Sequence, residues 1–163
     1  MDRPQLVDKG AFQVIGIETR TRNADEANAA TGRICGLWER FFRENVRVKI
    51  PHQVGGSATL AVYSDYESDE KGAYCLTLGC EVRSLEDIPE GLTGRTIPAS
   101  RYAVFTTEKG ALPEIVIGAW QAIWGMDRAR LGGERRFSGD FEVYDKRTLD
   151  PSQAQVDIYI AIK

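Results

Sequence analysis

Glu142 is a lone acidic residue inside a short apolar and aromatic segment, Phe141-Glu142-Val143-Tyr144, whose pattern predicts a strand of a buried sheet. Successive side chains of a strand point to opposite faces, so Glu142 should share a face with Tyr144. Two hypotheses fit this position: an outward face in contact with water, or a carboxylate held in a mostly apolar cleft. A carboxylate removed from water is costly without a partner, so a cleft of the second kind would favour cationic ligands.

Aromatic residues at matching places in the chain could form the walls of such a cleft. Their faces attract organic cations by about 0.5–2 kcal/mol each. Ordinary core packing is the competing explanation for the tryptophans, and the strand preference of tyrosine is the competing explanation for the tyrosines. The candidate ligand-binding residues are Glu142 as the anionic anchor, with Trp38, Tyr63, Phe105, Trp120, Tyr144 and Tyr159 as candidate walls.

Motifs for other chemistries are missing from the sequence. It contains no glycine-rich phosphate loop ahead of a helix, no Gly-x-Ser-x-Gly and no His-Glu-x-x-His. His52 is the only histidine, and the cysteines have no Cys-x-x-Cys spacing, which predicts free thiols in a reducing compartment. We therefore predict no catalytic residue, no metal site and no cofactor, and we favour binding over catalysis. A glutamate beside a tyrosine could still perform general acid–base chemistry if burial raised the pKa of its carboxyl group.

Length and composition indicate one globular domain spanning residues 1–163. The net charge of -3 and the lack of a clustered basic patch argue against a nucleic-acid surface. Neither predicted helix offers the basic contacts that DNA recognition needs, so direct sequence-specific DNA binding is not expected. No apolar run approaches the roughly 20 residues that cross a bilayer, and the N-terminus lacks the apolar segment of a signal peptide. The expected location is the cytoplasm, without a membrane partner.

Hydrophobic periodicity indicates that one order of elements, strand–helix–strand–strand, occurs twice. Helices are predicted over residues 27–45 and 113–125, and residues 46–57 and 128–139 are predicted to be irregular. Strands are predicted over residues 12–18, 59–63, 74–82, 96–106, 141–146 and 155–162.

The two pseudo-repeats cover about residues 5–83 and 95–163, and equivalent residues recur within them. Trp38 precedes Tyr63 by 25 residues, and Trp120 precedes Tyr144 by 24 residues. A single unit has one helix and cannot bury the apolar face of its own sheet, whereas two units side by side can. We predict an α+β fold with one antiparallel sheet of about eight strands, two helices on one face and a ligand cleft at the central seam.

Several segments, taken in order, resemble the GyrI-like small-molecule-binding family, which includes effector-binding domains of AraC-type transcription activators and multidrug-sensing regulators. The resemblance extends over about residues 5–163. The segments that carry it are residues 12–17, 37–41, 79–82, 97–105, 141–144 and 156–160.

The resemblance implies a duplicated βαββ, SHS2-like fold with an acidic residue in its cleft, which falls on Glu142. We expect lipophilic, often cationic ligands such as dyes, drugs or secondary metabolites. Family members that inhibit DNA gyrase or hydrolyse electrophilic compounds keep two alternatives open. Regulator-type members carry a DNA-binding domain ahead of this one, and fewer than a dozen residues precede the first predicted strand here. The expectation is therefore a free-standing module that affects genes through a separate regulator or by sequestering its ligand.

Overall fold

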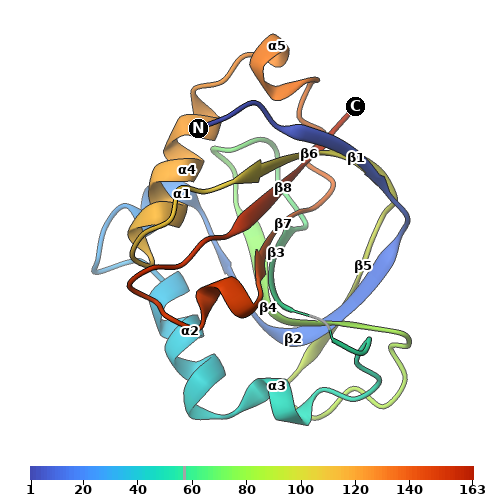
Figure 1. Ribbon diagram of the computed structural model, residues 1–163. Coiled ribbons are helices and arrows are strands. Elements are labelled where there is room, and N and C mark those ends of the chain that lie inside the picture. The colour runs from blue at the N-terminus through green and yellow to red at the C-terminus, as the bar shows by residue number, and fades with distance from the viewer. Residues whose placement is uncertain (57) are drawn as a thin grey trace.

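Segments rich in β-branched and aromatic residues form one antiparallel sheet of eight strands (Figure 1). The computed structural model describes residues 1–56 and 58–163. The strands lie in the order β1-β6-β8-β7-β3-β4-β2-β5. Their bounds are β1 Gln5–Lys9, β2 Phe12–Thr21, β3 Thr59–Ser64, β4 Tyr74–Val82, β5 Thr93–Ile97, β6 Ser100–Thr106, β7 Asp140–Tyr144 and β8 Asp157–Ile162.

Two helices of ten and eleven residues, α2 and α4, accompany shorter helical turns. None of the helices in the described residues is long and apolar enough to span a bilayer. The bounds are α1 Asn23–Glu26, α2 Ile34–Arg43, α3 Val46–Lys49, α4 Glu114–Trp124, α5 Arg128–Leu131 and the 3-10 turn η1 Lys146–Thr148.

The strand order is symmetrical about the central pair β3 and β7. Each half of the chain supplies a three-stranded unit, β2-β4-β3 or β6-β8-β7, and the units join where Ala61 lies opposite Glu142. The outer strands are exchanged, since β1 pairs with β6 of the other half and β5 pairs with β2. The predicted α+β sheet of about eight strands is thereby confirmed.

Several elements differ from the sequence-based expectation, among them β1, which none of the predicted strands covers. The strand expected over residues 96–106 is split between β5 and β6 at Pro98, which has no N–H to donate to a sheet. The first long helix begins at Ile34 rather than near residue 27, because the Glu26 carboxylate accepts the backbone N–H groups of Arg33 and Ile34 at the helix start. The segments expected to be irregular contain α3 and α5, and position 57 lies outside the described residues.

The two longer helices lie on the same side of the curved sheet, as expected (Figure 1). Leu37 and Phe41 of α2 pack on the apolar side chains of β2 and β4, and the buried face of α4 packs on β6 and β8. Tyr63 and Tyr144 contact both of these apolar clusters. The centre of the sheet therefore lies beneath the seam between α2 and α4.

A third apolar cluster fills the opposite, inner face of the sheet. It joins Phe12 of β2, Ile97 of β5, Tyr102 of β6 and Phe141 of β7. Tyr159 of β8 stacks on Phe141 with ring centroids 4.4 Å apart. Both faces of the sheet are thus packed, and a side chain's parity along its strand decides which cluster it joins.

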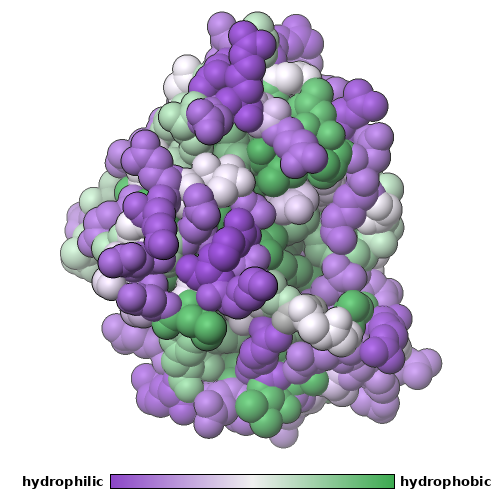
Figure 2. Space-filling model, viewed as in Figure 1, coloured by the Kyte–Doolittle hydropathy of each residue, from purple (hydrophilic) through white to green (hydrophobic). Residues whose placement is uncertain are grey.

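Hydrophilic side chains cover most of the face seen in Figure 2, with apolar surface confined to separate patches. One patch lies at the lower left, where Figure 1 places α2. The exposed large apolar residues include Phe42 on α2 and Val48 on α3. Scattered exposure of this kind is usual for globular proteins.

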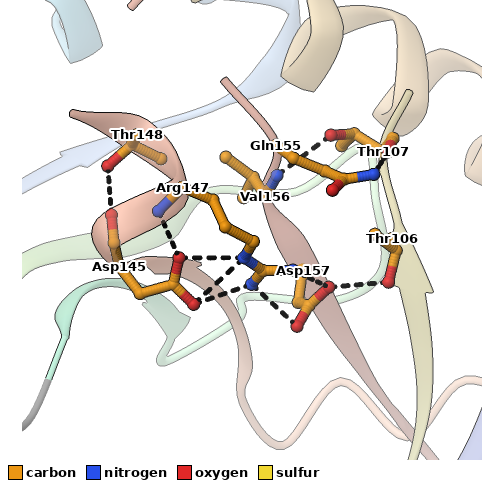
Figure 3. A network of polar contacts seen from close by, with 8 residues as sticks. All are labelled: Thr106, Thr107, Asp145, Arg147, Thr148, Gln155, Val156 and Asp157. Carbon is orange, nitrogen blue, oxygen red and sulfur yellow. Dashed lines mark hydrogen bonds and ion pairs between the residues drawn. The ribbon is translucent and has the colours of Figure 1, made fainter. Parts of the chain in front are cut away.

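Arg147 ties the chain that follows β7 to the start of β8 (Figure 3). Its guanidinium donates to the Asp145 carboxylate at 2.8 Å and to the Asp157 carboxylate at 3.0 Å. The Thr106 hydroxyl donates to Asp157 at 2.7 Å. Because Asp145 directly follows Tyr144, this network holds the end of the strand that carries Tyr144.

We expect Arg147→Met to lower stability at pH 7 by about 1 kcal/mol, since two partly exposed ion pairs are lost. The Arg147 side chain lowers the pKa of Asp145 below its ordinary value of 3.8, so the pair's stabilisation is present above that value and lost as the pH falls through the lowered pKa. Thermal unfolding at pH 7 and pH 3 should show a smaller acid-induced loss in the variant than in the parent. Lys146→Met, at an exposed neighbouring position, is the control. An equal acid-induced loss of stability in the parent and in Arg147→Met would contradict the stabilising role assigned to the Arg147 ion pairs.

Candidate functional site

A cavity of about 350 Å³ lies at the seam between the two halves of the fold. Side chains of α2 and α4 form its walls, and side chains of β3 and β7 form its floor. The residues that the argument uses are Trp38 from α2, Trp120 and Trp124 from α4, and Tyr63, Glu142 and Tyr144 from the sheet.

Glu142 lies at the floor of this cavity and is 2 % exposed. The Tyr63 hydroxyl and the Trp120 indole N–H each donate to its Oε2 at 2.7 Å. The Tyr144 hydroxyl donates to its Oε1 at 2.6 Å. Three neutral donors therefore orient the carboxylate, and among the described residues no lysine or arginine forms an ion pair with it.

Burial raises the pKa of the Glu142 carboxyl, and the hydrogen bonds from Tyr144, Tyr63 and Trp120 offset only part of that rise. Burial and the negative charge of Glu142 hold the pKa values of Tyr63 and Tyr144 well above their ordinary range. Both phenols consequently remain protonated and act as donors. When ionised, the carboxylate carries a charge that the described residues stabilise by neutral hydrogen bonds, and a cation in the cavity would supply a partner of opposite charge.

The aromatic contacts around Glu142 cross from one half of the chain to the other. Tyr63 of the first half meets Trp120 of the second with centroids 5.2 Å apart. Tyr144 of the second half meets Trp38 of the first at 4.8 Å. The small side chain of Ala61 lies opposite Glu142 in the β3–β7 pairing. Neither half alone can assemble this site, because each tyrosine packs on the other half's tryptophan.

The structure brings together five of the seven candidate residues, Glu142, Trp38, Tyr63, Trp120 and Tyr144. The other two, Phe105 and Tyr159, lie outside the cavity.

Phe105 is 1 % exposed and belongs to the core beneath α4. Tyr159 lies opposite Phe141 in the β7–β8 pairing, so it faces the inner cluster, whereas Ile158 lies opposite Glu142. The prediction that Phe105 and Tyr159 form walls of the cavity is therefore wrong. Core packing beneath α4 places Phe105 elsewhere, and the β7–β8 register places Tyr159 on the inner face of the sheet.

Sequence reasoning missed several residues that line the cavity. Trp124 follows Trp120 by one helical turn, with ring centroids 6.3 Å apart, and this spacing was visible in the sequence. No local sequence pattern identified the loop residues, because the tertiary fold brings them to the cavity. The missed residues include Trp124, Tyr66, Tyr74, Glu26, Glu70 and Arg135.

Residues 5–162 match a protein family, Cass2, described as integron-associated effector-binding proteins. The chain belongs to the Cass2 family. The effector-binding domain implied by the sequence resemblance is thus confirmed, under a family name other than GyrI-like.

Relatives of this Cass2 chain include proteins named as regulators. YobU of Bacillus subtilis, whose name describes a candidate transcriptional regulator, is 36% identical over 148 residues, covering 91% of this chain and 90% of that protein. The transcriptional regulator BrlR of Pseudomonas aeruginosa is 35% identical over 163 residues, covering 97% of this chain and 54% of BrlR. The chain thus spans about half the length of BrlR.

The solved structure of SAV2435 shares the fold of this Cass2 chain. Its TM-score is 0.78 at 21% identity, with 100% of this chain and 94% of that chain covered.

Proposed function

We propose that this protein binds a lipophilic organic cation in the cavity between α2 and α4, with the Glu142 carboxylate as the anionic anchor. The observation that carries the proposal is a carboxylate that is buried among aromatic rings and whose partners, among the residues that the structure describes, are all neutral hydrogen-bond donors. Trp38, Tyr63, Trp120 and Tyr144 are the proposed walls.

Physical chemistry favours a large organic cation over a small hydrated one at this site. A small ion would have to give up strong hydration to enter an apolar cavity, whereas a cation with aromatic or alkyl substituents gains apolar contact on entry. Aromatic faces add about 0.5–2 kcal/mol each when they contact the charge. The raised pKa of Glu142 adds a further expectation, since a bound cation stabilises the ionised form and should lower that pKa.

Support by analogy comes from SAV2435, whose structure was solved with tetraphenylphosphonium bound. Tetraphenylphosphonium carries a permanent positive charge surrounded by its own phenyl rings. The cavity of this protein would favour a cation of that kind. The regulator names of YobU and BrlR support a role in which ligand occupancy signals to gene expression. Within that role we propose sequestration of the ligand or signalling through a separate regulator. A gyrase partner gains no support from the comparisons.

All three tryptophans of the sequence line the cavity, so intrinsic fluorescence should report occupancy directly. Titration with tetraphenylphosphonium should give saturable quenching, and tetraphenylborate, an anion of nearly the same shape, should bind at least about tenfold more weakly. Triphenylphosphine oxide serves as the neutral comparison. Equal affinity for the cation and the anion would overturn the proposal.

The hydrolase alternative is testable with the same preparation. A raised carboxyl pKa beside two tyrosines is compatible with general acid chemistry on an electrophile. Incubation with a cyclopropane-containing electrophile, followed by mass spectrometry, should return the compound unchanged if the site only binds. Turnover that Glu142→Gln abolishes would establish the hydrolase instead.

A further inference from the structure

Two further carboxylates line the cavity besides that of Glu142. Glu26 belongs to α1, the short helical turn that follows β2, and Glu70 belongs to the loop between β3 and β4. Among the described residues, Arg135 is the one basic residue that lines the cavity, and its guanidinium donates to the Asp140 carboxylate at 2.7 Å. With its carboxylates ionised, the lining of the cavity therefore carries an excess of negative charge.

Neither of these two carboxylates has a cationic partner within the chain. Glu26 accepts the backbone N–H groups of Arg33 and Ile34 at 2.8 and 3.0 Å, and both donors are neutral. Across residues 1–56 and 58–163, no lysine or arginine forms an ion pair with Glu26 or Glu70, and the Glu70 carboxylate accepts no hydrogen bond. A cation in the cavity would give these groups a partner of opposite charge.

Tyr74 connects the floor of the cavity to α1. Its ring contacts the ring of Tyr63 with centroids 5.4 Å apart, and the Tyr63 hydroxyl donates to Glu142. The hydroxyl of Tyr74 donates at 2.9 Å to the side chain of Asn23, which lies three residues before Glu26 on α1. Two tyrosine rings thus separate the Glu142 carboxylate from the part of the cavity that α1 lines.

Glu70 adjoins the same part of the cavity. Its backbone oxygen accepts the side-chain amide of Asn23 at 2.9 Å. Burial, and then the negative charges of Glu26 and Glu142, raise the pKa of the Tyr74 hydroxyl above its ordinary value of 10.0, so Tyr74 lies within electrostatic reach of both carboxylates. The cavity therefore has one anionic group on its floor and a second acidic end, formed by Glu26 and Glu70, beside α1.

We propose that the cavity prefers organic ligands with two cationic centres joined by an apolar linker, one centre held by Glu142 and the other by the acidic end. This inference rests on the proposed function, because it places the first cationic centre at Glu142. The rings of Tyr63 and Tyr74 would contact the linker. A ligand with a single charge satisfies only one of the two anionic regions, so a second charge should tighten binding.

The test compares two triphenylphosphonium ions by quenching of tryptophan fluorescence. The alkyl tail of one ends in a trimethylammonium group, and the equally long tail of the other ends in a tert-butyl group, which has nearly the same shape but no charge. Tail length is varied in both series, because the tail must span the two tyrosine rings. Without a second anionic region, the more apolar tert-butyl probe should bind at least as tightly. We expect the parent to bind the dication at least about fivefold more tightly at the best tail length.

The double variant Glu26→Gln/Glu70→Gln should bring the two affinities within about twofold of each other. One oxygen of Glu26 accepts both Arg33 and Ile34, and the amide oxygen of glutamine can do the same, so the start of α2 keeps its acceptor. Glu67→Gln is the matched control, because Glu67 is exposed in the same loop as Glu70 and does not line the cavity. This control should keep the preference for the dication.

A preference below about twofold in the parent at every tail length, or one that survives the double variant, overturns the acidic end while leaving the cation site at Glu142 intact. Loss of the preference in Glu67→Gln as well would trace it to the general charge of the loop and would also overturn the proposal. Failure of the parent to bind either probe overturns the proposed function and the acidic end together. If the double variant does not fold, Glu70→Gln alone decides, and it must reduce the preference at least about twofold.

Discussion

Glu142→Gln should weaken tetraphenylphosphonium binding at least about tenfold and should raise the thermal stability of the ligand-free protein at neutral pH. The loss of affinity follows because the amide cannot neutralise a cation. The gain in stability follows because the amide needs no charge removed from water. Its oxygen can accept from Tyr63 and Trp120, and its NH₂ can donate to the Tyr144 oxygen, so the three hydrogen bonds survive.

The sign of the stability effect comes from the raised pKa. A carboxyl group whose folded-state pKa lies above its ordinary value of 4.5 contributes its stabilisation fully below that value and loses it as the pH rises through the folded-state pKa. At neutral pH the ionised Glu142 therefore favours unfolding relative to glutamine. Binding of a permanent cation should correspondingly weaken as the pH falls through the folded-state pKa, and the variant should lack that dependence.

The measurement pairs fluorescence titration with thermal unfolding, each repeated across the pH range. Glu26, Glu70 and Arg135, which pairs with Asp140, also border the cavity, so only the difference between parent and variant reports on Glu142. Glu39→Gln, on an exposed position of α2, supplies the same chemical change away from the cavity. Unchanged cation affinity in Glu142→Gln would contradict the role of Glu142 as the anionic anchor. A lower melting temperature at neutral pH would refute the stability argument.

Gly16→Ala should destabilise the protein by at least about 3 kcal/mol, or prevent it from folding. Gly16 of β2 lies opposite Gly79 of β4. A Cβ at Gly16 would stand 2.0 Å from the carbonyl oxygen of Leu78, and one at Gly79 would stand 1.9 Å from that of Ile15. These obstacles are backbone atoms, which no rotamer change can move, so the strands would have to separate beneath α2.

Chemical denaturation of the variant, with Gly36→Ala as its control, checks this expectation. A Cβ at Gly36 in α2 meets nothing within 4 Å, so alanine there should stabilise the helix by about 0.5–1 kcal/mol. A loss below about 1 kcal/mol in Gly16→Ala would show that β2 and β4 can part without consequence.

Local pattern was sufficient for much of this protein. The spacing of Val116, Trp120 and Ile123 predicts the buried face of α4, and all three are buried. The recurrence of strand–helix–strand–strand predicts the two-helix, antiparallel architecture. Strand parity predicts that Glu142 shares a face with Tyr144, and the two side chains are hydrogen-bonded. These features depend on residues close in the chain, whose relative directions follow from the geometry of one helix or one strand.

Tertiary structure alone decided what surrounds the carboxylate. Parity shows that Tyr159 opposes its neighbours Ile158 and Ile160, but the register of β8 against β7 places it beside Phe141 rather than Glu142. Arg135 reaches the cavity from a loop with no periodicity to mark it. The crossed contacts of Tyr63 with Trp120 depend on how two halves of the chain dock. Register, sheet curvature and docking are set by the summed packing of many distant residues, so no local spacing in the sequence contains them.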